Sequence, residues 1–141
     1  MNAAQMTPMT EMTQERSAMD RKYQWNVEAL YPSWEAWAQE LDIWGREGSS
    51  PHWPELVPFR KTWNQSHENL KKLLELCFDI DRHLSKLYTY AHLRHDEDVA
   101  GDEAKKAHSR IMTLLYAFRQ ETAWIEPEVL QLSEEQLQAL L

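Results

Sequence analysis

A heptad-like pattern between residues 70 and 91 constrains the fold more than any other feature of the sequence. Apolar side chains recur there at alternating intervals of three and four residues: Leu70, Leu73, Cys77, Ile80, Leu84, Leu87 and Ala91. In an α-helix this spacing places all of them on one narrow strip of the surface, which we call the apolar seam. Such a strip must be buried, so the pattern predicts a long helix that packs against another helix.

A second helical pattern follows the first. The first helix is expected to begin after Ser66, which can cap it, and to run to about Arg94, before the acidic residues 96–98. Apolar residues then recur at helical spacing over 102–125. Glu126-Pro127 is expected to end that second helix, because the residue before a proline avoids helical geometry.

These two helices should form a hairpin, because both carry an apolar face and the connection between them is short. We expect residues 67–95 to pack antiparallel to 102–125, with Leu84 or Leu87 close to Ile111 and Leu114. The predicted fold class is therefore all-α, a helical bundle built on a long antiparallel helical hairpin. The content of only three glycines and six prolines in 141 residues agrees with a helical chain.

Shorter helices are expected before the hairpin. Ser33 is placed to cap a helix that begins at Trp34 and ends near Gly45. Residues 48–58 hold three prolines and are expected to form a loop, and a short helix is expected over 59–64.

The last residues have a helical pattern as well. Ser133 and Gln136 have the spacing of a capping box, which predicts a helix over 137–141. Its apolar residues, Leu137, Leu140 and Leu141, have no evident partner, so we expect a truncated chain. Six tryptophans in the first 63 residues point the same way, because they need more apolar surface than the hairpin supplies: Trp25, Trp34, Trp37, Trp44, Trp53 and Trp63.

Two segments differ in composition. Residues 1–20 are rich in Met, Thr and Gln without periodicity, and are expected to form a disordered tail. Residues 21–141 are expected to form one helical domain that is incomplete at its C-terminal end.

The composition also excludes several functions. With a formal net charge of −8 and no dense Lys/Arg patch, the chain is not expected to bind nucleic acid. No apolar run is long enough to span a membrane, and the N-terminus lacks the order of a signal peptide. The single Cys77 cannot form an intrachain disulfide and is expected to be a small buried hydrophobe. We therefore expect a cytoplasmic protein.

The end of the first long helix carries residues of the types that bind metals. His92 and His95 share a helix face, with Asp96 and Asp98 close by in sequence, and zinc sites often use such histidine pairs. The His-Glu-x-x-His motif is absent, however, and no third ligand is placed by the sequence. We expect a polar helix end there rather than a metal site.

Other candidate sites are equally incomplete. The acidic residues around 96–103 lack the ligand order of a calcium loop, so a solvated turn is expected. His83 and His108 lie beside the apolar faces, and His52 and His67 carry no pattern. The aromatic residues Tyr88, Tyr90 and Trp124 could line a peptide channel, although core packing explains them as well. No catalytic, cofactor-binding or metal-binding residue is assigned to this chain.

Three segments carry more individual motifs. Residues 25–33 read Trp-Asn-Val-Glu-Ala-Leu-Tyr-Pro-Ser, residues 87–94 read Leu-Tyr-Thr-Tyr-Ala-His-Leu-Arg, and residues 126–130 read Glu-Pro-Glu-Val-Leu. In order and spacing, these segments resemble the N-terminal region of the oligoendopeptidase F family of thimet-like zinc metallopeptidases. Residues 59–63 depart from that family's Phe-x-Gly-Lys-Leu pattern.

The resemblance implies part of an all-helical cytoplasmic enzyme that hydrolyses short peptides with one zinc ion. In that family His-Glu-x-x-His and a later Glu bind the metal, and none of these residues can be placed on this chain. The implied role is a helical lobe that helps to wall the substrate channel, with the downstream catalytic domain and short peptides as partners. The alternative is a free-standing, non-catalytic module whose apolar seam pairs with another chain.

Overall fold

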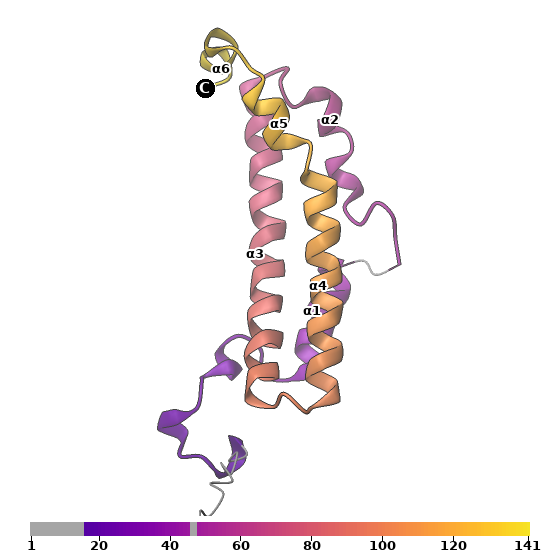
Figure 1. Cartoon of the computed structure of the whole chain (residues 1–141). Coiled ribbons are helices and arrows are strands. Elements are labelled where there is room, and N and C mark those ends of the chain that lie inside the picture. Colours follow the sequence, from indigo (N-terminus) through magenta and orange to yellow (C-terminus); the bar gives the residue numbers. More distant parts are fainter. Residues whose placement is uncertain (1–15, 46–47) are drawn as a thin grey trace, which may run out of the picture.

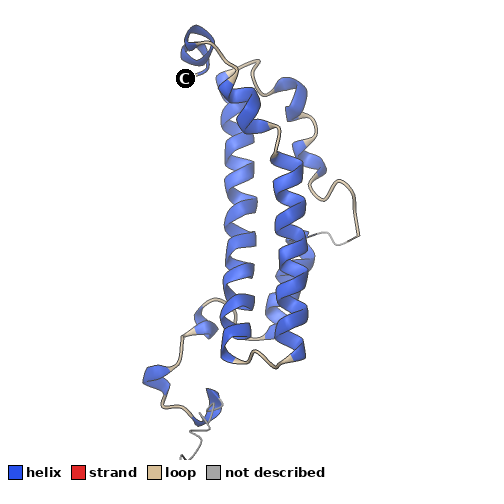
Figure 2. Cartoon of the chain, in the orientation of Figure 1, coloured by secondary structure: helices blue, strands red, loops and turns tan. Residues whose placement is uncertain are grey.

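In the computed structural model, residues 16–45 and 48–141 are described, and this part of the chain is helical without a β-strand (Figure 2). The all-α fold class predicted from the sequence is confirmed. The structure contains these α-helices: α1 (Trp34–Gly45), α2 (Phe59–Thr62), α3 (His67–Glu97), α4 (Asp102–Thr122), α5 (Ile125–Leu130) and α6 (Glu134–Leu140). Short 3-10 helices precede α1 and α2: η1 (Arg16–Ala18), η2 (Arg21–Tyr23), η3 (Val27–Ala29) and η4 (Pro54–Leu56).

Helices α3 and α4 lie side by side and run in opposite directions, joined by a short turn (Figure 1). The side chain of Ser66 begins α3 by accepting a hydrogen bond from the backbone N–H of Asn69 at 3.1 Å. An ion pair of 3.5 Å between Glu68 and Lys72 supports the first turns. The facing strips are buried: Leu73, Ile80, Leu84, Leu87 and Ala91 on α3, and Ala104, Ala107, Ile111, Leu114 and Phe118 on α4.

Helix α1 packs on one side of this hairpin. It begins where predicted, because the Ser33 hydroxyl accepts a hydrogen bond of 3.2 Å from the backbone N–H of Ala36. At its other end the backbone of Gly45 lies against the side chain of Leu114. A Cβ atom at residue 45 would overlap the end of that side chain, which would then have to shift.

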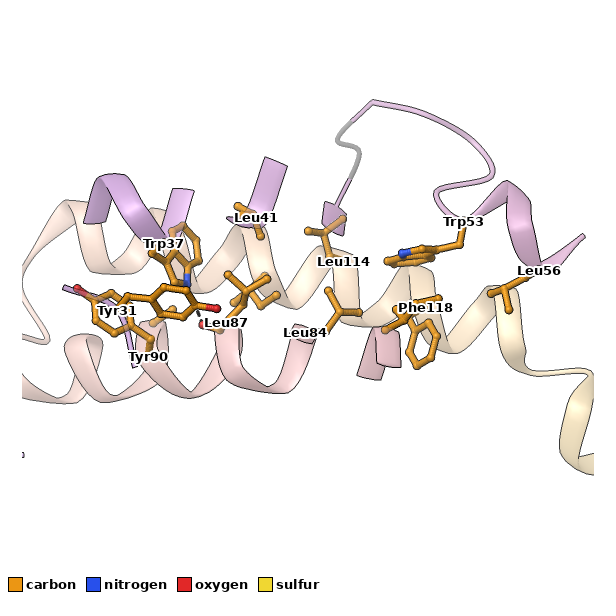
Figure 3. Packing of buried hydrophobic residues seen from close by; sticks show 14 of the residues in the cluster. Tyr31, Trp37, Leu41, Trp53, Leu56, Leu84, Leu87, Tyr90, Leu114 and Phe118 are labelled. Carbon is orange, nitrogen blue, oxygen red and sulfur yellow. Dashed lines mark hydrogen bonds between the residues drawn. The ribbon is translucent and has the colours of Figure 1, made fainter. Parts of the chain in front are cut away.

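The tryptophans are better covered than the sequence suggested. Trp37, Trp53 and Trp63 are buried, and Trp53 packs edge-on against Phe118 with ring centroids 5.4 Å apart (Figure 3). Only Trp25 is exposed to 50% of its surface. Trp34 and Trp44 are partly buried against the same core, so the expected shortage of apolar surface is seen in full only at Trp25.

The end of α3 also differs from the expectation. The helix continues past Arg94 to Glu97, through part of the acidic segment that was expected to end it. Acidic residues are unfavourable at a helix C-terminus, but the carboxylate of Glu97 is paired with two guanidinium groups. The Nε of Arg16 donates a 2.7 Å hydrogen bond to the Glu97 carboxylate, Arg94 lies 3.8 Å from it, and His92 lies 3.4 Å from Asp96.

Pro127 does not end a helix as predicted. Helix α4 already ends at Thr122, and α5 begins at Ile125 with Pro127 inside its first turn. The first backbone N–H groups of a helix have no intrahelical acceptor, so a proline there removes no hydrogen bond. The indole of Trp124 donates a 3.0 Å hydrogen bond to the carbonyl of Glu121 and so occupies the bend between the two helices.

Helix α6 begins earlier than predicted, at Glu134, while its capping box is confirmed. The Ser133 side chain accepts from the Gln136 backbone, and the Gln136 side chain accepts from the Ser133 backbone. Leu140 is buried in the common core, contrary to the expectation that it had no partner. Leu137 and Leu141 remain exposed.

The predicted tail, residues 1–20, falls mostly on residues 1–15, which lie outside the described residues. Of the remainder, Arg16 belongs to η1 and is bonded to the end of α3. The division into a tail and one helical domain stays a prediction. Among the helices of the described part, none is both long and apolar enough to cross a lipid bilayer.

The core of the hairpin gives a direct stability prediction. Leu84→Ala should lower the free energy of unfolding by about 2–5 kcal/mol, because Leu84 is fully buried and its removal leaves a cavity. Urea unfolding followed by circular dichroism measures the difference. Ser85→Ala, at the exposed neighbouring position, is the control and should change the free energy by less than about 0.5 kcal/mol. Equal effects of the two substitutions would contradict the hairpin core.

Candidate functional site

Two of the three motifs that resemble the oligoendopeptidase F family meet in the folded chain. Tyr31, from the first motif, packs edge-on against Tyr90, from the second, with ring centroids 5.4 Å apart (Figure 3). Trp34 packs against the same tyrosine at 5.1 Å. The guanidinium of Arg94 lies 5.5 Å from the Trp34 ring and 5.9 Å from the Tyr90 ring. We call these four residues the aromatic junction.

A buried hydrogen bond fixes α1 against the same part of α3. The indole N–H of Trp37 donates to the backbone carbonyl of Leu87 at 2.9 Å (Figure 3). Trp37 is almost completely buried, so this bond satisfies a donor that has no access to water. The aromatic residues Tyr31, Trp37 and Tyr90 are therefore core residues. Burial raises the pKa of Tyr31, with a further contribution from the charge of Glu40, so this phenol stays protonated.

A hollow of about 780 Å³ lies at the turn between α3 and α4, and we call it the turn cleft. Its lining combines the indole of Trp34, the guanidinium groups of Arg16 and Arg94, and acidic residues of the turn. The Arg16 guanidinium is paired with Glu97 at 2.7 Å and with Glu28 at 2.9 Å. The turn cleft therefore presents positive and negative charges together with an aromatic ring. Because the Arg16 guanidinium is already paired, the cleft is not a simple binding site for an anion.

Three histidines and a tyrosine gather on the outer side of the hairpin near the same turn. The rings of Tyr88 and His92 are stacked at 5.3 Å, and His108 of α4 lies 5.7 Å from His92 and 5.5 Å from His95. The Nδ1 atoms of His92 and His95 are buried without a hydrogen-bond partner. Burial lowers the pKa of His108, and the nearby charges of His92 and His95 lower it further, while Asp96 opposes them.

This cluster does not have the arrangement of a metal centre. In the ranges 16–45 and 48–141, no group of three or more His, Cys, Asp or Glu side chains could hold a metal ion. The residues present therefore do not fit the zinc ion of the resembling family. Of the acidic segment beside the cluster, only residues 98–101 form a turn, in which Asp98 accepts hydrogen bonds from the backbone of Ala100 and Gly101, while its other acidic residues lie at the end of α3 and the start of α4.

Two other histidines have structural partners that the sequence did not reveal. His83 stacks on Trp44 with ring centroids 3.8 Å apart and lies 2.8 Å from a Glu40 carboxylate oxygen. His52 lies 3.1 Å from Glu121. The carboxylate of Glu121 also accepts backbone N–H bonds from His52 at 2.6 Å and from Trp53 at 3.0 Å, and thereby holds the proline-rich loop on α4.

Cys77, expected to be a small buried hydrophobe, is partly buried and packs against the core. Burial raises the pKa of its thiol to about 11, so the thiolate is scarce at neutral pH. A nucleophilic role for this cysteine is therefore disfavoured, in agreement with the sequence interpretation.

The comparisons with known proteins point to one group of enzymes. No family model matches the sequence. Group B oligopeptidase PepB of Streptococcus agalactiae is 28% identical over 135 residues, which are 92% of this chain and 21% of that protein. Oligopeptidase PepF of Bacillus subtilis is 27% identical over 127 residues, which are 90% of this chain and 18% of that protein.

A solved structure agrees with these relatives. The crystal structure of a candidate peptidase from Chlamydophila abortus matches with a TM-score of 0.81 and 35% sequence identity, over 90% of this chain and 21% of that chain. The chain thus spans about a fifth of the length of the proteins that it matches. Its resemblance to oligoendopeptidase F is confirmed, and the partial coverage is consistent with a resemblance to that family's N-terminal region.

The histidine cluster predicts a pH-dependent stability. Because the pKa of His108 is lower in the folded chain than its ordinary value of 6.5, the unfolded chain binds the proton more tightly. The free energy of unfolding should therefore be highest above pH 6.5 and should decrease as the pH drops below this value. Urea unfolding at a series of pH values measures this change. Between pH 6.5 and lower pH, the free energy of unfolding should decrease less for His108→Gln than for the original chain. Ser109→Gln, which leaves all titrating groups in place, should keep the original fall, and an unchanged fall in His108→Gln would refute the assignment.

We also predict that the 141-residue chain does not retain zinc. After incubation with zinc and dialysis, metal analysis should find far less than one zinc ion per chain, because no three His, Cys, Asp or Glu side chains in the described part of the chain are arranged to hold a metal ion. The double variant His92→Ala/His95→Ala is the control and should retain the same small amount. One tightly held zinc ion that disappears in the double variant would overturn the prediction.

Proposed function

We propose that this chain is the N-terminal helical part of a zinc-dependent oligopeptidase, and that it helps to wall the channel through which short peptides reach the catalytic site. The observation that carries the proposal is the structural match over 90% of the chain to a candidate peptidase, at 35% identity. The names of the sequence relatives, oligopeptidase and oligoendopeptidase, support the same activity. Because the chain covers only about a fifth of each, the activity belongs to a longer protein.

The geometry suits a rigid wall. Helix α3 has 31 residues and is therefore about 45 Å long, and α4 supports most of its length. The aromatic junction and the hydrogen bond from Trp37 to Leu87 hold α1 against the part of the hairpin that is near the turn between α3 and α4. A wall of this kind narrows a channel without moving, so unfolded short peptides enter and folded proteins do not.

We place the channel at the end of the hairpin that carries the turn cleft. This hollow combines an aromatic face with charges of both signs, which suits an extended peptide with varied side chains. Arg94 and Trp34 lie at its edge and are held in place by the aromatic junction. Residues of the turn cleft would then contact substrate, while catalysis takes place elsewhere.

The catalytic and zinc-binding residues of the proposed enzyme lie outside this chain. The sequence contains no His-Glu-x-x-His motif, and the described histidines do not form a metal site. The chain alone is therefore expected to hydrolyse no peptide. We place the enzyme in the cytoplasm, because the single cysteine cannot form an intrachain disulfide.

The decisive experiment starts from the gene. Reading past the codon for Leu141 should reveal a long continuation with a His-Glu-x-x-His motif, and the longer polypeptide should cleave a short fluorogenic peptide. A zinc chelator and the substitution of the motif's Glu by Gln should both abolish the cleavage. The same cleavage site inside a folded protein should remain uncut.

Two results would contradict this proposal. One is a stop codon directly after Leu141 together with a stable monomeric chain, which favours the free-standing interaction module. The other is a longer polypeptide that contains the motif and zinc but cleaves no short peptide.

A further inference from the structure

The hairpin has one covered face and one open face. On α3 the residues that contact α1 and the segment before it form one stripe, which includes His83, Leu87 and Tyr90. A second stripe on the same helix faces away from α1 and lines two neighbouring hollows: Leu74, Phe78, Asp81, Ser85 and Tyr88. These hollows measure about 450 and 370 Å³ and share the residues Asp81, Phe118 and Thr122. We call the two hollows together the open groove.

One end of the open groove is strongly apolar. The larger hollow lies between α3, the end of α4 and α5, and six of its ten lining residues are aliphatic or aromatic: Leu74, Phe78, Phe118, Ile125, Val129 and Leu130. Phe78 and Leu130, two of its lining residues, expose 64% and 76% of their surfaces. Exposed apolar residues that gather around a hollow mark a surface for another chain segment, in contrast to apolar residues that are exposed singly.

The groove also has a defined charge. Asp81 and Glu126 lie among the apolar residues of the larger hollow, and none of the described residues that line it is basic. Arg119 lines the adjoining hollow. An occupant that carries a lysine or arginine beside its apolar side chains would complement the acidic residues of the larger hollow.

We propose that the open groove is the docking site for an amphipathic helix that follows this chain in the same longer polypeptide. The proposal rests on the proposed function, because it requires the additional chain that the relatives contain beyond the matched fifth. A groove between two antiparallel helices accepts a third helix whose ridge of side chains fits between them. The occupant should carry apolar residues at positions i, i+3, i+4 and i+7, with basic residues beside that stripe.

The path of the chain agrees with this occupant. Helix α6 packs against the first turns of α3, where the carbonyl of Leu140 lies 2.9 Å from the Nδ1 of His67. Leu74, seven residues after His67 on α3, lines the apolar end of the groove. A segment that continues from Leu141 in the longer polypeptide would thus start near this end, within reach of the groove.

The test compares two exposed positions of the longer polypeptide by their reactivity with a thiol reagent. In a Cys77→Ala background, one variant carries Phe78→Cys in the groove and the other carries Ile43→Cys on α1. In this structure the two positions are matched, with exposures of 64% and 68%. The labelling rate of each cysteine is measured by mass spectrometry of the peptide that contains it.

If a helix covers the groove, Phe78→Cys should react at least about tenfold more slowly than Ile43→Cys, because burial protects a thiol from reagent. Denaturant should abolish the difference. A second readout avoids the cysteines: Phe78→Ser should lower the melting temperature of the longer polypeptide, and Ile43→Ser should leave it unchanged. Equal labelling rates and equal melting temperatures would overturn the docking site.

The outcomes separate this proposal from the proposed function. If the longer polypeptide cleaves peptides but its two cysteines are labelled at equal rates, the proposed peptidase function is supported and the docking helix is refuted. A longer polypeptide that protects residue 78 but has no peptidase activity supports the docking helix and refutes the function. Protection that disappears on dilution would identify a second copy of the chain as the occupant and would overturn the proposal. A stop codon after Leu141 would refute both.

Discussion

The packing of α3 against α4 is the contact on which the other parts of the structure depend. Leu84 and Leu87 on one helix and Ile111 and Leu114 on the other are all buried in the common core. The elements from η3 onward add to this core rather than forming one of their own: α1 packs on one side of the hairpin, while η4, α2, α5 and α6 lie at the end away from the turn (Figure 1). Loss of the helix pair would therefore remove the support of these elements.

The two ends of the hairpin have different chemistry, and this difference organises the functional proposals. The turn end carries the aromatic junction, the histidine cluster and a cleft lined by charges of both signs. The opposite end is apolar and only partly covered, with Phe78 and Leu130 exposed. Polar clefts suit the transient binding of a peptide, whereas apolar grooves suit permanent burial by another helix. We therefore propose that the substrate binds at the turn end of the hairpin and that the following helix docks towards the opposite end.

Helix starts and the pairing of the two long apolar faces could be predicted from the sequence, whereas contacts between single polar side chains and distant residues could not. Ser33, Ser66 and Ser133 begin helices because each accepts a hydrogen bond from a backbone N–H three residues later. The carboxylate of Glu121, in contrast, binds backbone atoms 68 and 69 residues away, and no local pattern encodes that contact. The same holds for Arg16, which bonds to Glu97 across 81 residues and allows α3 to continue through acidic positions. Pro127 misled the prediction because a proline that ends one helix is equally compatible with the first turn of another.

The central claim is that this chain forms a wall of a peptidase channel, and the location of a bound peptide tests it most directly. The measurement is an experimental structure of the longer polypeptide, made inactive by substitution of its catalytic Glu and soaked with a short peptide substrate. We predict that the peptide lies against the turn cleft, in contact with Trp34 or Arg94. A peptide bound without any contact to residues 16–141 would contradict the account.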